Sequence, residues 1–205
     1  APTGLEVVGG DEQLDLSWDA PISNGGSAIT GYRIDFTSNT NVGVVSGMFQ
    51  TQVALTSHTL TDLTNGGSYS VTVAAVNAEG TGVATAVVQG TPYTRSGPPS
   101  GLNGVLVGGT LVLSWSAPSV TGGTVVTGYR VEQRVTGGDL WTVVIDNTGS
   151  VFTTYNVLGL AEGRAYDFQV SAVNAAGVGP ISASWSATVP ATTTLATVPA
   201  TTTLA

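Results

Sequence analysis

The sequence predicts an all-β fold built from two copies of one module, each of roughly 95 residues and so near the commonest domain size. Tyr69–Asn77 and Tyr166–Asn174 place a tyrosine and then apolar side chains on every second position, the period of a strand with one face on a core. The two segments lie 97 residues apart (166 − 69), and the same offset relates Trp18 to Trp115, Tyr32 to Tyr129 and Pro21 to Pro118. The 28 glycines, many valines and threonines and the lack of a long apolar run favour short strands and turns.

Each module opens with a proline just ahead of its first strand, at Pro2 and at Pro99. A proline there begins a strand without removing a ladder hydrogen bond, and it protects the edge of the sheet. The segment Gln13–Asp19 and its twin Thr110–Ser116 then alternate strictly, as half-buried antiparallel strands do. The residues expected to face the core are Leu14, Leu16 and Trp18, and in the twin Leu111, Leu113 and Trp115.

A loop rich in proline and glycine follows in each module, at residues 20–26 and 117–123. Each loop leads into a third strand that carries an inward tyrosine, Tyr32 or Tyr129. The modules then differ. The second has a glycine turn before a predicted strand at 140–145, whereas the first has a looser segment over 44–55.

The tyrosines that open the long central strands, Tyr69 and Tyr166, each follow a leucine by six residues, with glycine between. In Greek-key sandwiches this arrangement lets the buried hydroxyl bond back to the backbone of the preceding corner. A buried hydroxyl needs a partner, so the spacing predicts a tyrosine corner in both modules. The complete set of predicted structural residues is Trp18, Tyr32, Leu63, Tyr69, Trp115, Tyr129, Leu160 and Tyr166.

Three features make the chain resemble a tandem of fibronectin type III domains. These are the tryptophan of the second strand, Gly-Tyr-Arg with an apolar residue in the third, and Leu-x5-Tyr-x-apolar-x-Val-x-Ala-Val-Asn-Ala-x-Gly at 63–80 and 160–177. The resemblance implies two seven-stranded, immunoglobulin-like β-sandwiches. The expected division is a first domain at 1–91, a linker at 92–97, a second domain at 98–188 and a repeated, extended Thr/Pro-rich tail at 189–205.

The resemblance also implies a spacer or adhesive role in a secreted or cell-surface protein. The low-lysine, threonine-rich composition leads us to expect a prokaryotic source. Some family members bind integrins through Arg-Gly-Asp after the sixth strand, but the loops here read Asn77-Ala-Glu-Gly and Asn174-Ala-Ala-Gly. That activity is therefore not carried over.

Composition excludes several functional classes. Residues 1–94 hold eight carboxylates against Arg33, and residues 98–205 hold five against three arginines, so the modules carry about −7 and −2 charges. A nucleic-acid partner would need a basic stripe, which is missing.

Without cysteine or lysine there is no disulfide, metal thiolate or Schiff-base chemistry. We expect no membrane span, and the absence of a targeting segment before Ala1 fits a mature or excised fragment.

His58, the only histidine, cannot form a His-His or His-Cys metal site, and no Gly-x-Ser-x-Gly nucleophile elbow accompanies it. It is expected to be a surface residue, and the protein is predicted not to be an enzyme and to need no cofactor. A group of carboxylates could hold Ca²⁺, which takes six or more oxygens, although a solvated acidic face is the favoured interpretation. This group comprises Asp11, Glu12, Asp15 and Asp19.

Five aromatic residues fall outside the shared core pattern and could form a platform for sugar rings. They share no spacing, so packing at strand edges or at the junction of the modules is favoured. They are Phe49, Tyr93, Trp141, Tyr155 and Trp185.

The linker is expected to be stiffened by its prolines, with a bend permitted at Gly97. Behind the second module, Thr188–Ala196 repeats unchanged as Thr197–Ala205. Nine residues are three turns of a polyproline II helix, which would put one apolar stripe on a single side of an extended stalk. The stripe, a candidate assembly surface that could dock on a neighbouring module of a second copy, consists of Val189, Leu195, Val198 and Leu204.

The sequence thus predicts a non-catalytic extracellular structural or adhesive module pair. It could be a segment of a filament or surface protein that assembles head to tail through its C-terminal tail. The partners expected are proteins, including a second copy, and carbohydrate could be a further one. The alternative is a spacer or accessory region of a secreted polysaccharide-degrading enzyme with weak carbohydrate contact.

Overall fold

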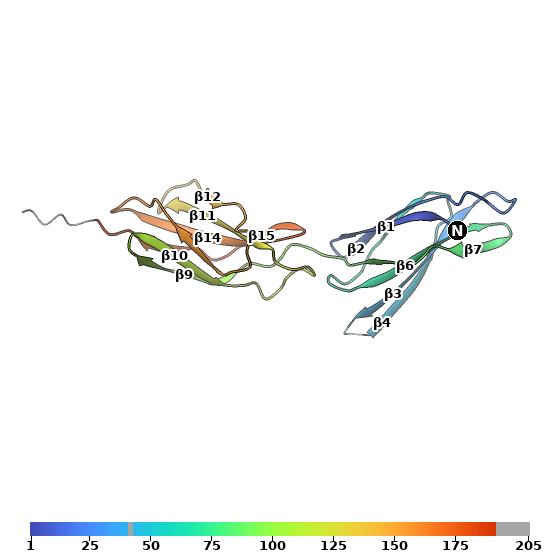
Figure 1. Cartoon of the computed structure of the whole chain (residues 1–205), viewed down its shortest axis with the longest axis horizontal. Helices are drawn as coiled ribbons and strands as arrows, with labels where there is room; N and C mark the ends of the chain where they lie inside the picture. Colours follow the sequence, from blue (N-terminus) through green and yellow to red (C-terminus); the bar gives the residue numbers. More distant parts are fainter. Residues whose placement is uncertain (41–42, 192–205) are drawn as a thin grey trace, which may run out of the picture.

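A computed structural model describes residues 1–40 and 43–191. It confirms the predicted fold class: two β-sandwiches lie end to end along the chain, and the described residues contain no helix (Figure 1). The strands of the first module are β1 (Thr3–Gly10), β2 (Gln13–Asp19), β3 (Gly31–Thr40), β4 (Gly43–Gln50), β5 (Ser57–Leu60), β6 (Tyr69–Asn77), β7 (Gly80–Ala84) and β8 (Val88–Gly90). Those of the second are β9 (Ser100–Val107), β10 (Thr110–Ser116), β11 (Gly128–Val135), β12 (Thr142–Ile145), β13 (Thr154–Val157), β14 (Ala165–Asn174), β15 (Gly177–Ile181) and β16 (Trp185–Thr188).

Both modules have the same antiparallel topology. The smaller sheets run β1-β2-β5 and β9-β10-β13, and the larger sheets run β4-β3-β6-β7 and β12-β11-β14-β15. β7 and β8 pair with successive parts of the same edge of β6. In the second module, β15 and β16 pair in this way with β14. Each of these pairs is therefore one interrupted edge strand, which gives every module the expected seven strands.

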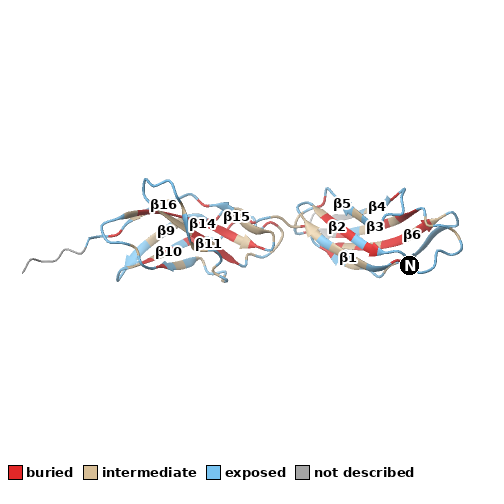
Figure 2. Cartoon of the chain, turned by 90° about the horizontal axis from the view of Figure 1, so that it is seen from above, coloured by how far each residue is buried: buried red, intermediate tan, exposed pale blue. Residues whose placement is uncertain are grey.

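Alternating side chains from the two sheets of each module meet in a separate core (Figure 2). At the centre of the first core Trp18 packs edge-on against Tyr32, with ring centroids 5.1 Å apart and planes at 67°. Trp115 and Tyr129 repeat this contact in the second core at 5.0 Å and 67°. The repeated sequence thus produces a repeated packing geometry, and each module buries its own apolar face.

The structure differs from the sequence expectation in three segments. The looser segment after β3 begins with a regular strand, β4, because it pairs with β3 from Arg33–Gln50 to Thr40–Gly43. The predicted strand at 140–145 begins only at Thr142. Val189, assigned to the tail and its assembly stripe, is instead 6% exposed in the second core, where it is held by backbone bonds with Arg164 and Gly163. Its side chain is therefore not available for assembly. The other three residues of the stripe, Leu195, Val198 and Leu204, lie outside the described residues.

Candidate functional site

The predicted structural residues lie inside the two sandwiches. All are buried except Leu160, which is half-buried against the second core. The hydroxyl oxygen of Tyr69 accepts a hydrogen bond from the backbone N–H of Thr64, and that of Tyr166 accepts one from Ala161. Both tyrosines therefore connect the central strand to the corner before it, which is a structural role.

His58 lies on β5 and stacks on Phe49 of β4, with ring centroids 4.1 Å apart and planes at 20°. Partial burial disfavours the charged imidazolium and lowers the pKa of His58. Over residues 1–40 and 43–191, no group of three or more histidine, cysteine or carboxylate side chains comes together where it could hold a metal ion. The contact between His58 and Phe49 joins β5 to β4, which belong to opposite sheets of the first module.

Two of the acidic residues considered for calcium, Asp11 and Asp15, accept hydrogen bonds from neutral donors of their own module. Asp15 accepts hydrogen bonds from Gln13 and from the hydroxyl of Thr59, the latter at 2.7 Å. Asp11 accepts one from the side chain of Asn65 at 2.8 Å. These contacts fasten loops and neighbouring strands together, as expected for an acidic face.

The five additional aromatic residues are spread over different environments and form no shared platform. Trp141 lies under the guanidinium of Arg134, 4.7 Å from the ring centroid. The other four pack against separate partners: Phe49 on His58, Tyr93 beside Gly9, and Tyr155 and Trp185 on the second core. The described structure therefore offers no stacked surface for a sugar.

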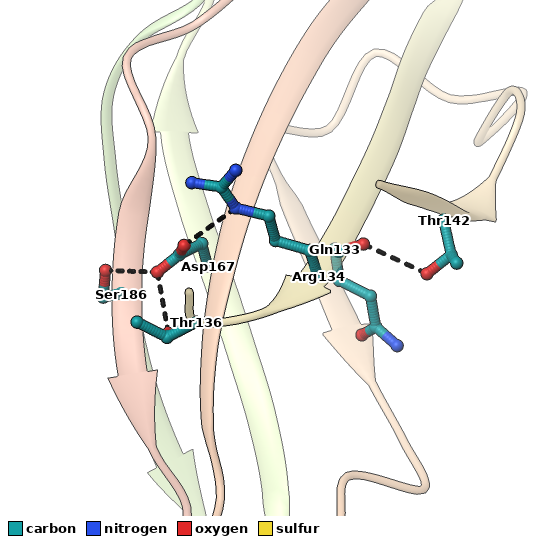
Figure 3. A network of polar contacts seen from close by, with 6 residues as sticks. All are labelled: Gln133, Arg134, Thr136, Thr142, Asp167 and Ser186. Carbon is teal, nitrogen blue, oxygen red and sulfur yellow. Dashed lines mark hydrogen bonds and ion pairs between the residues drawn. The ribbon is translucent and has the colours of Figure 1, made fainter. Parts of the chain in front are cut away.

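A buried carboxylate that the sequence did not indicate lies on β14 of the second module. Asp167 accepts hydrogen bonds from the hydroxyls of Ser186 at 2.7 Å and Thr136 at 2.8 Å, and pairs with Arg134 at 2.9 Å (Figure 3). The two hydroxyls and the guanidinium lower the pKa of Asp167. The first module has Ser70 at this position (167 − 97), so this network belongs to one module only.

The linker is bonded to both modules. On the first module, Pro92 O accepts from Gly66 N and Tyr93 N donates to Gly10 O, both at 2.8 Å. On the second module, the bonds are Thr94 N to Gly122 O, Gly97 N to Val120 O, the Ser96 hydroxyl to Thr121 O, and Asn174 Nδ2 to Thr94 O. Ser96 is completely buried. Gly97 was expected to permit a bend, but its N–H is committed to the second module.

A groove on the first module lies at the end opposite the linker, beside the N-terminus and β7 (Figure 1). This leading groove has a volume of about 330 Å³ and lies between the loop 21–25 and the turn 77–83, with Ala1 at its side. Asn77 Nδ2 donates across it to Asn24 O at 2.8 Å. The sequence carried a signal for this groove, since its glycines and Asn77 recur in the second module at the same offset.

Comparison with known proteins identifies the repeated module. A family model described as Fibronectin type III domain matches residues 1–91 and 97–188. The relatives include M-protein, striated muscle, from Gallus gallus (31% identical over 188 residues, 88% of this chain) and Netrin receptor DCC from Homo sapiens (30% over 181 residues, 85% of this chain). The chain spans only 13% and 12% of these two relatives.

Among solved structures, a two fibronectin type-III domain segment from chicken tenascin is 22% identical, with a TM-score of 0.43, and the match covers 92% of this chain and 99% of that one. The relatives named here are animal proteins, so they lend no support to the expected prokaryotic source. In the described part of the chain, no helix is long and apolar enough to cross a membrane.

Proposed function

Because the chain belongs to the fibronectin type III family, we propose that it is a non-catalytic structural and adhesive module pair of a longer extracellular or cell-surface protein. In this role the two sandwiches hold whatever lies on either side of them at a fixed separation and direction. The names of the relatives, a striated-muscle protein and a netrin receptor, support a structural or adhesive use.

The observation that carries this proposal is the linker. Six hydrogen bonds fasten residues 92–97 to both sandwiches, two to the first and four to the second. A segment held on both sides has lost most of its backbone freedom, so bending the pair requires several of these bonds to break together. Such a joint suits a spacer that transmits position or force.

The distribution of reactive groups supports a role without catalysis. His58 is stacked on Phe49, and the buried Asp167 has its oxygens occupied by two hydroxyls and a guanidinium. Neither lines the leading groove, whose lining contains one charged side chain, Glu79. A general acid and base facing one cavity would be expected of a hydrolase.

We further propose that copies assemble head to tail through the segment that follows the second module. Contacts of this kind do not close on themselves and can extend a fibre. Sedimentation velocity from micromolar to millimolar protein tests the idea, with a variant that ends at Ala191 as the control. We expect the sedimentation coefficient of the full chain to rise with concentration and that of the shortened chain to stay constant. Equal behaviour of the two chains would contradict assembly through the tail.

A further inference from the structure

The edges of the sheets are built to resist pairing, with one exception. An edge strand presents unpaired N–H and C=O groups to which another strand can add, and short, bulged or interrupted strands limit this. β5, β12 and β13 have four residues each. β1 and β9 are bulged, and two further edges are interrupted, one between β7 and β8 and the other between β15 and β16. Among the edge strands of residues 1–40 and 43–191, only β4 lacks all these features.

β4 is long, regular and uncharged. It pairs with β3 at every position from Gly43 to Gln50, without a bulge. Its counterpart in the second module, β12, pairs at three positions and is bulged. From Phe36 to Ser57 the sequence has no charged residue and no proline, two further devices that protect an edge. The free side of β4 is therefore open to strand addition.

The backbone groups on this free side follow from the last bond between β4 and β3. The N–H of Thr51 donates to Tyr32 O at 2.8 Å, in the register of the preceding pairs. Because the backbone groups of an antiparallel strand alternate between its two sides, those of Gly47 and Phe49 also point toward β3. The residues whose groups point away from β3, where no described strand pairs with them, are Ser46, Met48 and Gln50.

The second half of β4 is anchored to its own module. The ring of Phe49 stacks on His58 of the opposite sheet, and the hydroxyl of Thr51 accepts a hydrogen bond from Tyr32 N at 2.7 Å. Beside the free edge, Met48 is 57% exposed. An incoming strand would thus meet a preformed template, and little of its binding free energy would be used to order β4.

Charge selects the kind of strand that can add. The edge is neutral, but the first module carries about −7 charges and the whole chain −8. Asp35, which lies beside Met48 in the sheet, is paired with Arg33 at 2.8 Å. A second copy of this chain would bring the same negative charge and be repelled, whereas a segment with basic residues would be attracted. The neutral edge suits an uncharged centre, and the acidic module suits basic flanks.

We propose that the free edge of β4 binds an extended segment of another protein, whose centre is uncharged and β-prone and whose flanks carry lysine or arginine. The segment adds as a further strand to the larger sheet of the first module. Main-chain hydrogen bonds to Ser46, Met48 and Gln50 supply affinity, as in other cases of strand addition. This gives the module pair a lateral partner, in addition to the neighbours that it holds apart along the chain.

The test uses a synthetic peptide of alternating valine and threonine with a pair of lysines at each end. It is added to the isotope-labelled full chain at constant protein concentration, and NMR follows hydrogen exchange of the backbone amides. We expect protection to rise at Ser46, Met48 and Gln50 and to stay unchanged at Gly47 and Phe49, whose N–H groups already face β3. Protection gained elsewhere, or none at millimolar peptide, would overturn the proposal.

A second peptide tests the choice of partner. With glutamates in place of the lysines, the same core should bind at least about tenfold more weakly at low salt, and added salt should reduce this difference. Equal affinities would overturn a cationic partner. Protection at the same three amides that rises with protein concentration alone would identify a second copy as the occupant and would also overturn the proposal.

Two variants of the chain test the edge itself. Met48→Pro removes an N–H that faces away from β3, a change that edge strands tolerate, and should weaken peptide binding at least about tenfold. Met48→Lys keeps this N–H but places a cation beside the basic segment, so it should also weaken binding. Val143→Lys is the matched control, since Val143 is 47% exposed on β12, and it should leave the affinity unchanged. Unchanged affinity in both Met48 variants would overturn the proposal.

Discussion

Gly123 of the second module packs so closely on Gly66 of the first that a Cβ on Gly123 would lie 2.4 Å from Gly66 N. Gly66 is also the residue whose N–H bonds to Pro92 at the start of the linker. Backbone contact between the modules and the bonds of the linker therefore meet at one place. The orientation of the two sandwiches is set there.

Replacing Gly123 by alanine should loosen this joint, because the added methyl group cannot fit against Gly66 N. Gly26→Ala is the matched control, since Gly26 has nearly the same φ (+89° against +87°) and has nothing within 4 Å of an added Cβ. Each change should cost roughly 1–2 kcal/mol from the left-handed backbone alone. Only Gly123→Ala should also broaden the distribution of overall dimensions that small-angle scattering measures. Equal distributions for the two variants would contradict the joint described here.

The tyrosine corners can be tested by removing one oxygen atom. Tyr69→Phe and Tyr166→Phe leave the N–H groups of Thr64 and Ala161 without their acceptors, now at 2.9 and 3.0 Å. We expect each change to destabilise its own module by roughly 1–3 kcal/mol, measured from urea unfolding midpoints. Tyr155→Phe is the control, because the Tyr155 hydroxyl has no hydrogen bond within the described structure. Midpoints that all stay equal would show that the corner bonds contribute nothing.

The core could be predicted from sequence because its signals are local and doubled. Strict alternation placed Trp18 and Trp115 inside, and the repeat of the core residues at one offset supported the assignment of both modules. The same logic failed for β4, whose glycine-rich sequence has weak alternation. Its strand conformation follows from pairing with β3, which a single-strand pattern does not report.

The carboxylate of Asp167 should make the second module sensitive to acid. Its folded pKa is lowered by the hydroxyls of Ser186 and Thr136 and by Arg134, so its stabilising effect is complete above the unfolded value, about 3.9. The effect is lost as the pH falls through the folded pKa. Asp167→Asn should therefore destabilise the second module at neutral pH and flatten its loss of stability in acid. Parallel pH profiles for the two proteins would rule out this contribution.

Sequence patterns miss such a network because its members come from β11, the segment after it, β14 and β16. Asp167 alternates outward on β14 like any exposed residue, and it is covered by neighbours on both sides, Arg134 of β11 and Ser186 of β16. Val189 was misplaced for a related reason: its tail-like surroundings in the sequence conceal its equivalence to the buried Pro92. The linker bonds were likewise hidden, since they depend on how two folded modules meet.

His58 offers a second titration, in the first module. Partial burial lowers its pKa below the usual value of about 6.5. The neutral form is thus preferred in the folded state, and the related stability is present above the unfolded pKa and decreases as the pH falls. Phe49→Ala removes the ring stacked on the imidazole at 4.1 Å and should raise the His58 pKa toward its usual value. NMR titration of the only histidine measures this directly, and an unchanged pKa would assign the burial to other neighbours.

The most direct test of the central claim, that the linker makes the two sandwiches one stiff unit, is the distance distribution between spin labels on the two modules. The protein has no cysteine, so Ser17→Cys and Ser114→Cys, exposed positions 97 residues apart, provide the only labelling sites. We predict a single narrow distance distribution in double electron–electron resonance, broadened by Gly123→Ala and not by Gly26→Ala. A broad distribution in the otherwise unchanged protein would contradict the account.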